Sequence, residues 1–267
     1  MISQLALFAS ALGCLLYALS ALMLTGRFFH REGPRESLSR WIAVSAALAH
    51  VVALYSSITL TDGQNMSIGN VLSLVAWLMT VAMLVSSIYF RNVILLPVVF
   101  GFSIIALLLS GFVPDVYSVN IGLKPGLIVH ITLSLFAYGT LIVALLYAVQ
   151  VNYISGQLKR KDTNLLHSSL PPLTMLDQIL IKLLYAGTSL LLVAVFSGTI
   201  FLDNMFDTQH IHKTVLTLVA LLCFIGALFS HKQWGLRGRP LLVTVAVGVS
   251  LLTLAYFGSR IVREIIL

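Results

Sequence analysis

Eight apolar runs of about twenty residues, separated by short polar or turn-forming segments, dominate this sequence of 267 residues. A run of that length crosses the hydrocarbon core of a bilayer as a helix, because a helix satisfies its own backbone hydrogen bonds where water is absent. Only 9% of the residues are charged, whereas a soluble domain carries roughly 25%. The sequence therefore predicts an all-α, polytopic integral membrane bundle with about eight transmembrane helices.

The predicted spans begin and end at Gly, Pro and charged residues, which punctuate the apolar runs. They cover Ser3–Thr25, Ser39–Leu60, Ser67–Phe90, Val93–Phe112, Gly126–Val151, Gln178–Leu202, Thr214–Ser230 and Pro240–Ser259. The third and fourth spans form a tight hairpin around Arg91-Asn92. No connecting segment is long enough to fold alone, so we predict one transmembrane domain over residues 1–267.

The distribution of basic residues predicts the orientation. If the loop after the first span is cytoplasmic, twelve Lys and Arg residues lie on the cytoplasmic side, and only Lys124, Lys213, Arg260 and Arg263 lie outside. This positive-inside bias predicts that both termini are on the outer side. The net charge of +7 is then explained by anionic lipid beside the cytoplasmic leaflet. A nucleic-acid partner is not expected, because no soluble basic face exists.

The longest connection, residues 152–178, leads into the sixth span through Leu170-Pro171-Pro172-Leu173. Thr174 is followed three residues later by Asp177, which is the spacing of a helix capping pattern. We therefore predict that Thr174 caps the sixth helix, with Asp177 in its first turn, where the helix dipole favours an anion.

Few residues in the spans could carry chemistry. Cys14 and Cys223 both lie within spans and form no Cys-x-x-Cys pair, which excludes a dithiol relay. The sequence has no phosphate-binding loop, no His-Glu-x-x-His and no Gly-x-Ser-x-Gly, and every Asp and Glu lies at a loop or a helix end. We therefore expect that the chain is not an enzyme, and histidine remains as the candidate functional residue.

Four histidines stand out by their positions. His130 and His212 fall at the same outer depth, on the fifth and seventh spans, whereas His50 and His231 are predicted toward the inner half of the second and seventh spans. An isolated histidine within a span is typical of a helix–helix hydrogen bond. Two histidines on facing helices can instead take both axial positions of a haem iron. Both interpretations remain open at the level of residues.

At these residues the chain resembles the cytochrome c assembly superfamily of haem-handling membrane proteins (the CcsA/CcmC/HemX-like group), and most closely its YpjD-type bacterial inner-membrane branch. The resemblance is best over roughly residues 120–267. It is carried by Leu127-Ile128-Val129-His130-Ile131 with Ser134 and Tyr138, by Leu170-Pro171-Pro172-Leu173 with Leu176-Asp177, Gly187 and Ser197-Gly198, by His212-Lys213-Thr214, and by His231, Arg237-Gly238-Arg239 and Ala255-Tyr256-Phe257-Gly258-Ser259.

The resemblance implies a multi-pass protein of the bacterial inner (cytoplasmic) membrane that binds or handles haem without being an enzyme. It implies His50 and His231 as a ligand pair within the membrane, His130 as an outer ligand, with His212 beside it, and haem iron as the metal. The expected partners are membrane lipid, haem and a membrane protein.

Two departures from the family pattern keep other functions open. The loop Leu202–His212 has no Trp, although the family presents haem on a Trp-rich loop here, and no second outer histidine occurs near Phe257. The alternative is a haem-free accessory or scaffold subunit that regulates a membrane partner such as an ion transporter. A third interpretation is a transporter of an apolar cargo.

Overall fold

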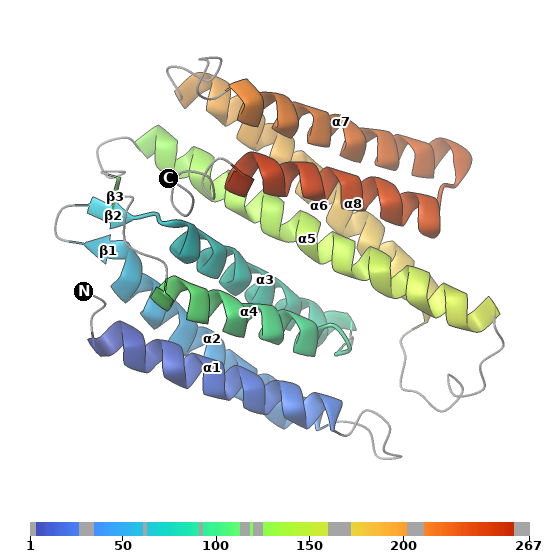
Figure 1. Ribbon diagram of the computed structural model, residues 1–267. Coiled ribbons are helices and arrows are strands. Elements are labelled where there is room, and N and C mark those ends of the chain that lie inside the picture. The colour runs from blue at the N-terminus through green and yellow to red at the C-terminus, as the bar shows by residue number, and fades with distance from the viewer. Residues whose placement is uncertain are drawn as a thin grey trace. The chain divides into compact units, whose positions relative to one another are not determined.

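The structure is a computed structural model that describes residues 4–26, 35–60, 63–90, 93–112, 118–119, 125–159, 172–201 and 211–258. The helices found in these ranges are α1 (Gln4–Thr25), α2 (Glu36–Ile58), α3 (Ile68–Phe90), α4 (Leu96–Phe112), α5 (Pro125–Lys159), α6 (Leu173–Phe201), α7 (Ile211–Trp234) and α8 (Arg239–Thr253). A π-helical turn, η3 (Leu254–Gly258), continues α8 (Figure 1).

Seven of the described helices are long and apolar enough to cross a membrane, and α8 reaches that length together with η3. The remaining helix, α4, has 17 residues and is therefore about 25 Å long. Large apolar side chains on the helix surfaces are exposed, as a lipid-facing surface requires; those of α1 are Leu5, Leu7, Phe8, Leu12, Leu15, Leu19 and Leu22. The predicted all-α, polytopic membrane bundle is confirmed. The orientation of the termini stays a prediction.

The chain divides into two compact units. The first unit contains residues 1–120 and 163–171, and the second contains residues 121–162 and 172–267. The single domain over residues 1–267 stays a prediction.

In the first unit α1 packs against α2 and α4, and α3 packs against α4 and α2. Helices α3 and α4 approach closely at Gly69, where an added Cβ would lie 2.8 Å from the Cα of Ser110.

The first unit also contains a small antiparallel sheet that the sequence did not predict. Its strands are β1 (Thr59–Leu60), β2 (Gly63–Asn65) and β3 (Ser118–Val119), in the order β1-β2-β3. Thr59 pairs with Gln64, and Gln64 also pairs with Val119. The predicted second span therefore ends earlier than expected, because Thr59–Leu60 leave the helix for a strand. The sheet joins the connection between α2 and α3 to the connection that follows α4.

In the second unit α5 packs against α6 and α8, and α7 packs against α6 and α8. Gly187 of α6 allows a close approach to α5, since a Cβ there would lie 2.8 Å from the side chain of Leu141. Helices α5 and α6 have 35 and 29 residues, which makes them about 52 and 43 Å long. Both exceed a hydrocarbon core of about 30 Å, so they extend beyond the predicted spans Gly126–Val151 and Gln178–Leu202.

The predicted cap of the sixth helix is wrong. Helix α6 already begins at Leu173, and the carbonyl of Pro172 accepts hydrogen bonds from the backbone N–H of Met175 at 3.0 Å and of Leu176 at 3.2 Å. Thr174 therefore lies inside the helix, and Asp177 lies beyond its first turn. The carboxylate of Asp177 instead forms an ion pair with Arg237, at 3.5 Å from its Nε. The first turn starts early because Pro172, which needs no N–H partner, stands directly before it.

Candidate functional site

His50 is completely buried in the first unit and uses both of its ring nitrogens. Its Nε2 lies 2.9 Å from the hydroxyl of Ser73 on α3, and its Nδ1 lies 3.3 Å from the hydroxyl of Tyr17 on α1. The Tyr17 ring also meets the imidazole edge to face and stacks on Phe100 of α4. His50 thus connects α2 to two other helices of its unit, and it would have to give up one hydrogen bond to bind iron.

Other polar contacts inside the first unit also join helix to helix. Ser20 of α1 and Ser39 of α2 lie 2.7 Å apart at their hydroxyl oxygens, and those of Thr80 and Ser103 on α3 and α4 lie 2.8 Å apart. Trp77 of α3 donates from Nε1 to the carbonyl of Ala47 on α2 at 2.9 Å. Such contacts specify how helices pack in lipid, where apolar surfaces alone give little preference. The environment of His50 is therefore that of a structural polar core.

His130 of the second unit is held differently. It is half-buried, five residues after the start of α5, and its Nδ1 lies 3.0 Å from the carbonyl oxygen of Ala194 and 3.1 Å from the hydroxyl of Ser197, both on α6. A carbonyl oxygen only accepts, so Nδ1 carries the proton. The hydroxyl of Ser197 donates to the same carbonyl at 2.8 Å, which leaves its lone pairs facing Nδ1. In the neutral ring, Nε2 is then the unprotonated nitrogen, with no partner among the described residues.

His231 near the end of α7 has the same arrangement. Its Nδ1 lies 2.9 Å from the carbonyl oxygen of Leu236, so Nδ1 donates and Nε2 keeps its lone pair. Histidines that bind metals commonly donate their other ring N–H to a backbone carbonyl, which fixes the tautomer and the orientation of the ring. His130 and His231 therefore fit the donor chemistry that haem iron needs, whereas His50 does not fit it in this arrangement.

His212 is exposed at the second residue of α7 and forms no hydrogen bond with another described residue. No hydrogen bond or ring contact joins it to His130 within the described part of the chain. The same part of the chain contains no cluster of three or more His, Cys, Asp or Glu side chains that could hold a metal ion. The Trp-free loop preceding His212 lies outside the described residues from Leu202 to His210.

The helix bounds place His50 and His231 at different distances from the ends of their helices. His50 lies 8 residues before the end of α2 at Ile58, or about 12 Å at 1.5 Å per residue. His231 lies only 3 residues before the end of α7 at Trp234, or about 5 Å. Whether either residue binds haem stays a prediction.

Sequence reasoning missed the residues that orient these histidines. Ser197 was noted only as part of Ser197-Gly198, and Tyr17 and Ser73 carried no signal. Tyr138 and Tyr256 carry the family resemblance, but their contact was not predicted: Tyr138 of α5 stacks on Tyr256 at 5.4 Å, and its hydroxyl lies 2.9 Å from that of Thr253 on α8. These partners are separated by 23 to 118 residues in the sequence. Only the folded chain brings them together.

Comparison with known proteins decides the family. The cytochrome C assembly protein family matches residues 38–267, which is most of the chain. The chain belongs to the cytochrome c assembly protein family. It is 36% identical to the inner membrane protein YpjD of Escherichia coli K12 over 253 residues, covering 94% of this chain and 95% of that protein. An uncharacterised 28.8 kDa protein of Azospirillum brasilense is 29% identical over 140 residues, or 52% of each chain.

No solved structure matches the chain. Membership of the family, together with the membrane-crossing helices, identifies a multi-pass protein of the inner membrane. The YpjD-type resemblance seen in the sequence is thereby confirmed. The match reaches well upstream of residue 120 and includes most of the first unit, so both units belong to the family domain.

Proposed function

We propose that this member of the cytochrome c assembly protein family is a non-enzymatic haem-handling protein, and that His130 of the second unit contacts the iron. One observation carries the proposal. The N–H at Nδ1 of His130 is directed to the carbonyl of Ala194, which leaves the lone pair of Nε2 available. The hydrogen bond itself joins α5 to α6, and it is Nε2, unpaired among the described residues, that supports a ligand at this position.

The surroundings of His130 favour a ligand that is largely apolar. The ring lies within the apolar length of α5, and neighbouring side chains on the same helix, Ile128 and Val129, are exposed by 43% and 48%. When bound, haem supplies an iron centre with two axial positions on a flat apolar ring. Ser197 and Ala194 orient the imidazole, and neither of them is a ligand. His231 repeats the arrangement and is the second candidate contact of the unit, while His212 remains exposed.

The proposal is tested by the absorption spectrum of the protein purified in detergent from haem-supplied cells, recorded oxidised and after reduction. We expect a Soret band in the native protein and a loss of most of its intensity in His130→Ala. The matched control is Ser197→Ala, which removes one partner of Nδ1 but keeps the carbonyl of Ala194, and it should retain the band.

Two results would contradict the proposal. The first is a protein that remains colourless after haemin is added. The second is a band of equal intensity per folded protein in His130→Ala and in the native chain. Folded protein is measured by the amount of monodisperse material recovered from gel filtration, so that a loss of colour is not mistaken for a loss of fold.

A further inference from the structure

The connection between α7 and α8 is an ordered turn rather than a loose loop. We name residues 230–239 the basic turn. The carbonyl of Leu236 accepts the N–H at Nδ1 of His231, and the N–H of Leu236 donates to the carbonyl of Ser230 at 3.3 Å. Gly235 and Gly238 have φ values of 65° and 67°, a left-handed conformation that other residues rarely adopt. The backbone of the turn is therefore held in one conformation.

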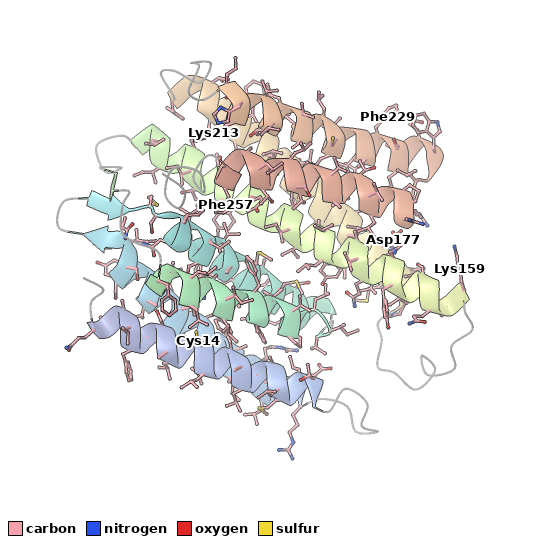
Figure 2. All side chains as sticks on the ribbon, in the orientation of Figure 1. Cys14, Lys159, Asp177, Lys213, Phe229 and Phe257 are labelled. Atoms are coloured by element: carbon pink, nitrogen blue, oxygen red, sulfur yellow. The ribbon has the colours of Figure 1, made fainter. Side chains whose placement is uncertain are left out.

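Positive charge concentrates on the basic turn. Lys232, Arg237 and Arg239 are exposed within eight residues of sequence, and the Nε of Arg237 lies 3.5 Å from the carboxylate of Asp177. Asp177 is the one acidic residue among the described residues of the second unit. Lys159 and Asp177 lie at the same end of this unit as Phe229, and Lys213 lies toward the other end (Figure 2). This end therefore has an excess of positive charge.

An exposed apolar surface continues directly from the basic turn along both helices. Trp234 is 75% exposed and meets the ring of Phe229 edge to face at 5.9 Å. Tryptophan at such a position marks the boundary between headgroups and hydrocarbon. Further from the turn, the exposed apolar side chains include Leu222 and Ile225 of α7 and Val243 and Val247 of α8. The turn thus carries both cations and Trp234, and exposed apolar side chains follow it on α7 and α8.

We propose that the basic turn binds the headgroup of an anionic phospholipid, with the acyl chains lying on the exposed faces of α7 and α8. The three cations would contact the phosphate, Trp234 would lie beside the glycerol region, and the aliphatic side chains would contact the hydrocarbon. The negative charge of a soluble acidic protein or of a nucleic acid would complement the cations, but neither partner offers an apolar part to contact the exposed apolar side chains of α7 and α8. An amphipathic anion matches both, and this complementarity favours lipid over those partners.

The test uses the full chain, stripped of lipid in detergent, and native mass spectrometry to count bound lipids. Dioleoylphosphatidylglycerol, dioleoylphosphatidylcholine and inorganic phosphate are titrated separately. Lys232→Gln/Arg239→Gln removes two cations and keeps the ion pair of Arg237 with Asp177, so the fold of the turn is preserved. We expect this variant to bind phosphatidylglycerol about tenfold more weakly than the native chain. Phosphatidylcholine should bind both proteins equally.

The matched control is Lys159→Gln/Lys182→Gln, which removes the same charge from α5 and α6 of the same unit. It should bind phosphatidylglycerol as the native chain does. An equal loss in both double variants would overturn the proposal in favour of a diffuse charge effect. Inorganic phosphate that competes fully with phosphatidylglycerol at millimolar concentration would overturn it in favour of a site for a free anion. No preference for phosphatidylglycerol in the native chain would overturn it outright.

Discussion

The two units use histidine in opposite ways. In the first unit His50 is fully buried, and hydroxyl groups from two other helices occupy both of its ring nitrogens. In the second unit His130 and His231 are half-buried, and each directs Nδ1 to a backbone carbonyl, so that Nε2 keeps its lone pair. The residue type is the same, but among the histidines that the structure describes, only those of the second unit leave a ring nitrogen available to a ligand. The number of free ring nitrogens, and not the presence of histidine within a span, therefore indicates where chemistry is possible.

The largest expected effect is on the stability of the first unit. His50→Leu leaves the buried hydroxyl groups of Tyr17 and Ser73 without their imidazole partner, and each such loss costs about 1–3 kcal/mol. We expect the free energy of unfolding in detergent to fall by about 2–4 kcal/mol, measured by thermal or denaturant unfolding. His130→Leu is the matched change in the second unit. It should cost about 1 kcal/mol or less, because Ser197 keeps its hydrogen bond to Ala194.

Equal losses of stability in these two variants would break the comparison, since they would make His130 as structural as His50. A smaller loss in His50→Gln than in His50→Leu would sharpen it. The glutamine amide can still donate to one hydroxyl and accept from the other, so part of the polar core should be retained.

A second prediction tests whether the second unit depends on the close packing of α5 against α6. Gly187→Leu places side-chain atoms where Leu141 of α5 already lies, because even a Cβ would come within 2.8 Å. Overpacking of this kind typically costs about 1–3 kcal/mol, and we expect a lower unfolding temperature. A Cβ added at Gly226 on α7 would meet nothing within 4 Å, so Gly226→Leu should leave the unfolding temperature unchanged or raise it. A larger loss in Gly226→Leu would show that α5 and α6 are not packed as described.

The smallest effect concerns the ion pair that replaced the predicted helix cap. Asp177→Asn weakens the contact with Arg237, whose side chain is 67% exposed, whereas that of Asp177 is 16% exposed. Water screens the pair on the side of Arg237, so we expect a loss of only about 0.5–1 kcal/mol in thermal unfolding. Because the chain contains no cap at Thr174, Thr174→Ala should be neutral within about 0.5 kcal/mol. A clear destabilisation by Thr174→Ala would restore the predicted cap.

The fold could be predicted from the sequence to the extent that it depends on apolar length. Runs such as Ser3–Thr25 and Ser67–Phe90 coincide with α1 and α3 within a few residues, because the thickness of the bilayer sets the length of a crossing helix. Strands β1 to β3 have only 2 or 3 residues, too few for an alternating pattern to be recognised. Pro172 lies outside α6, as the sequence predicted. The helix begins at the next residue, Leu173, which is earlier than the predicted start.

The candidate site could be predicted only as a set of residues. The sequence identified His50, His130, His212 and His231, but not the state of their nitrogens. That state depends on contacts such as Tyr17 with His50, 33 residues apart, and His130 with Ser197, 67 residues apart. A periodic pattern reports which face of a helix is apolar, and it does not report which side chain of another helix that face meets. The roles of the histidines therefore required the structure.

The most direct test of the account compares haem occupancy in His50→Gln and His130→Gln, purified side by side and corrected for folded protein. Haem per chain is measured as the pyridine haemochrome. The account predicts that His50→Gln retains the haem content of the native chain and that His130→Gln loses most of it. Loss of haem from His50→Gln with full retention in His130→Gln would contradict the account, because the iron would then be bound by the histidine of the first unit.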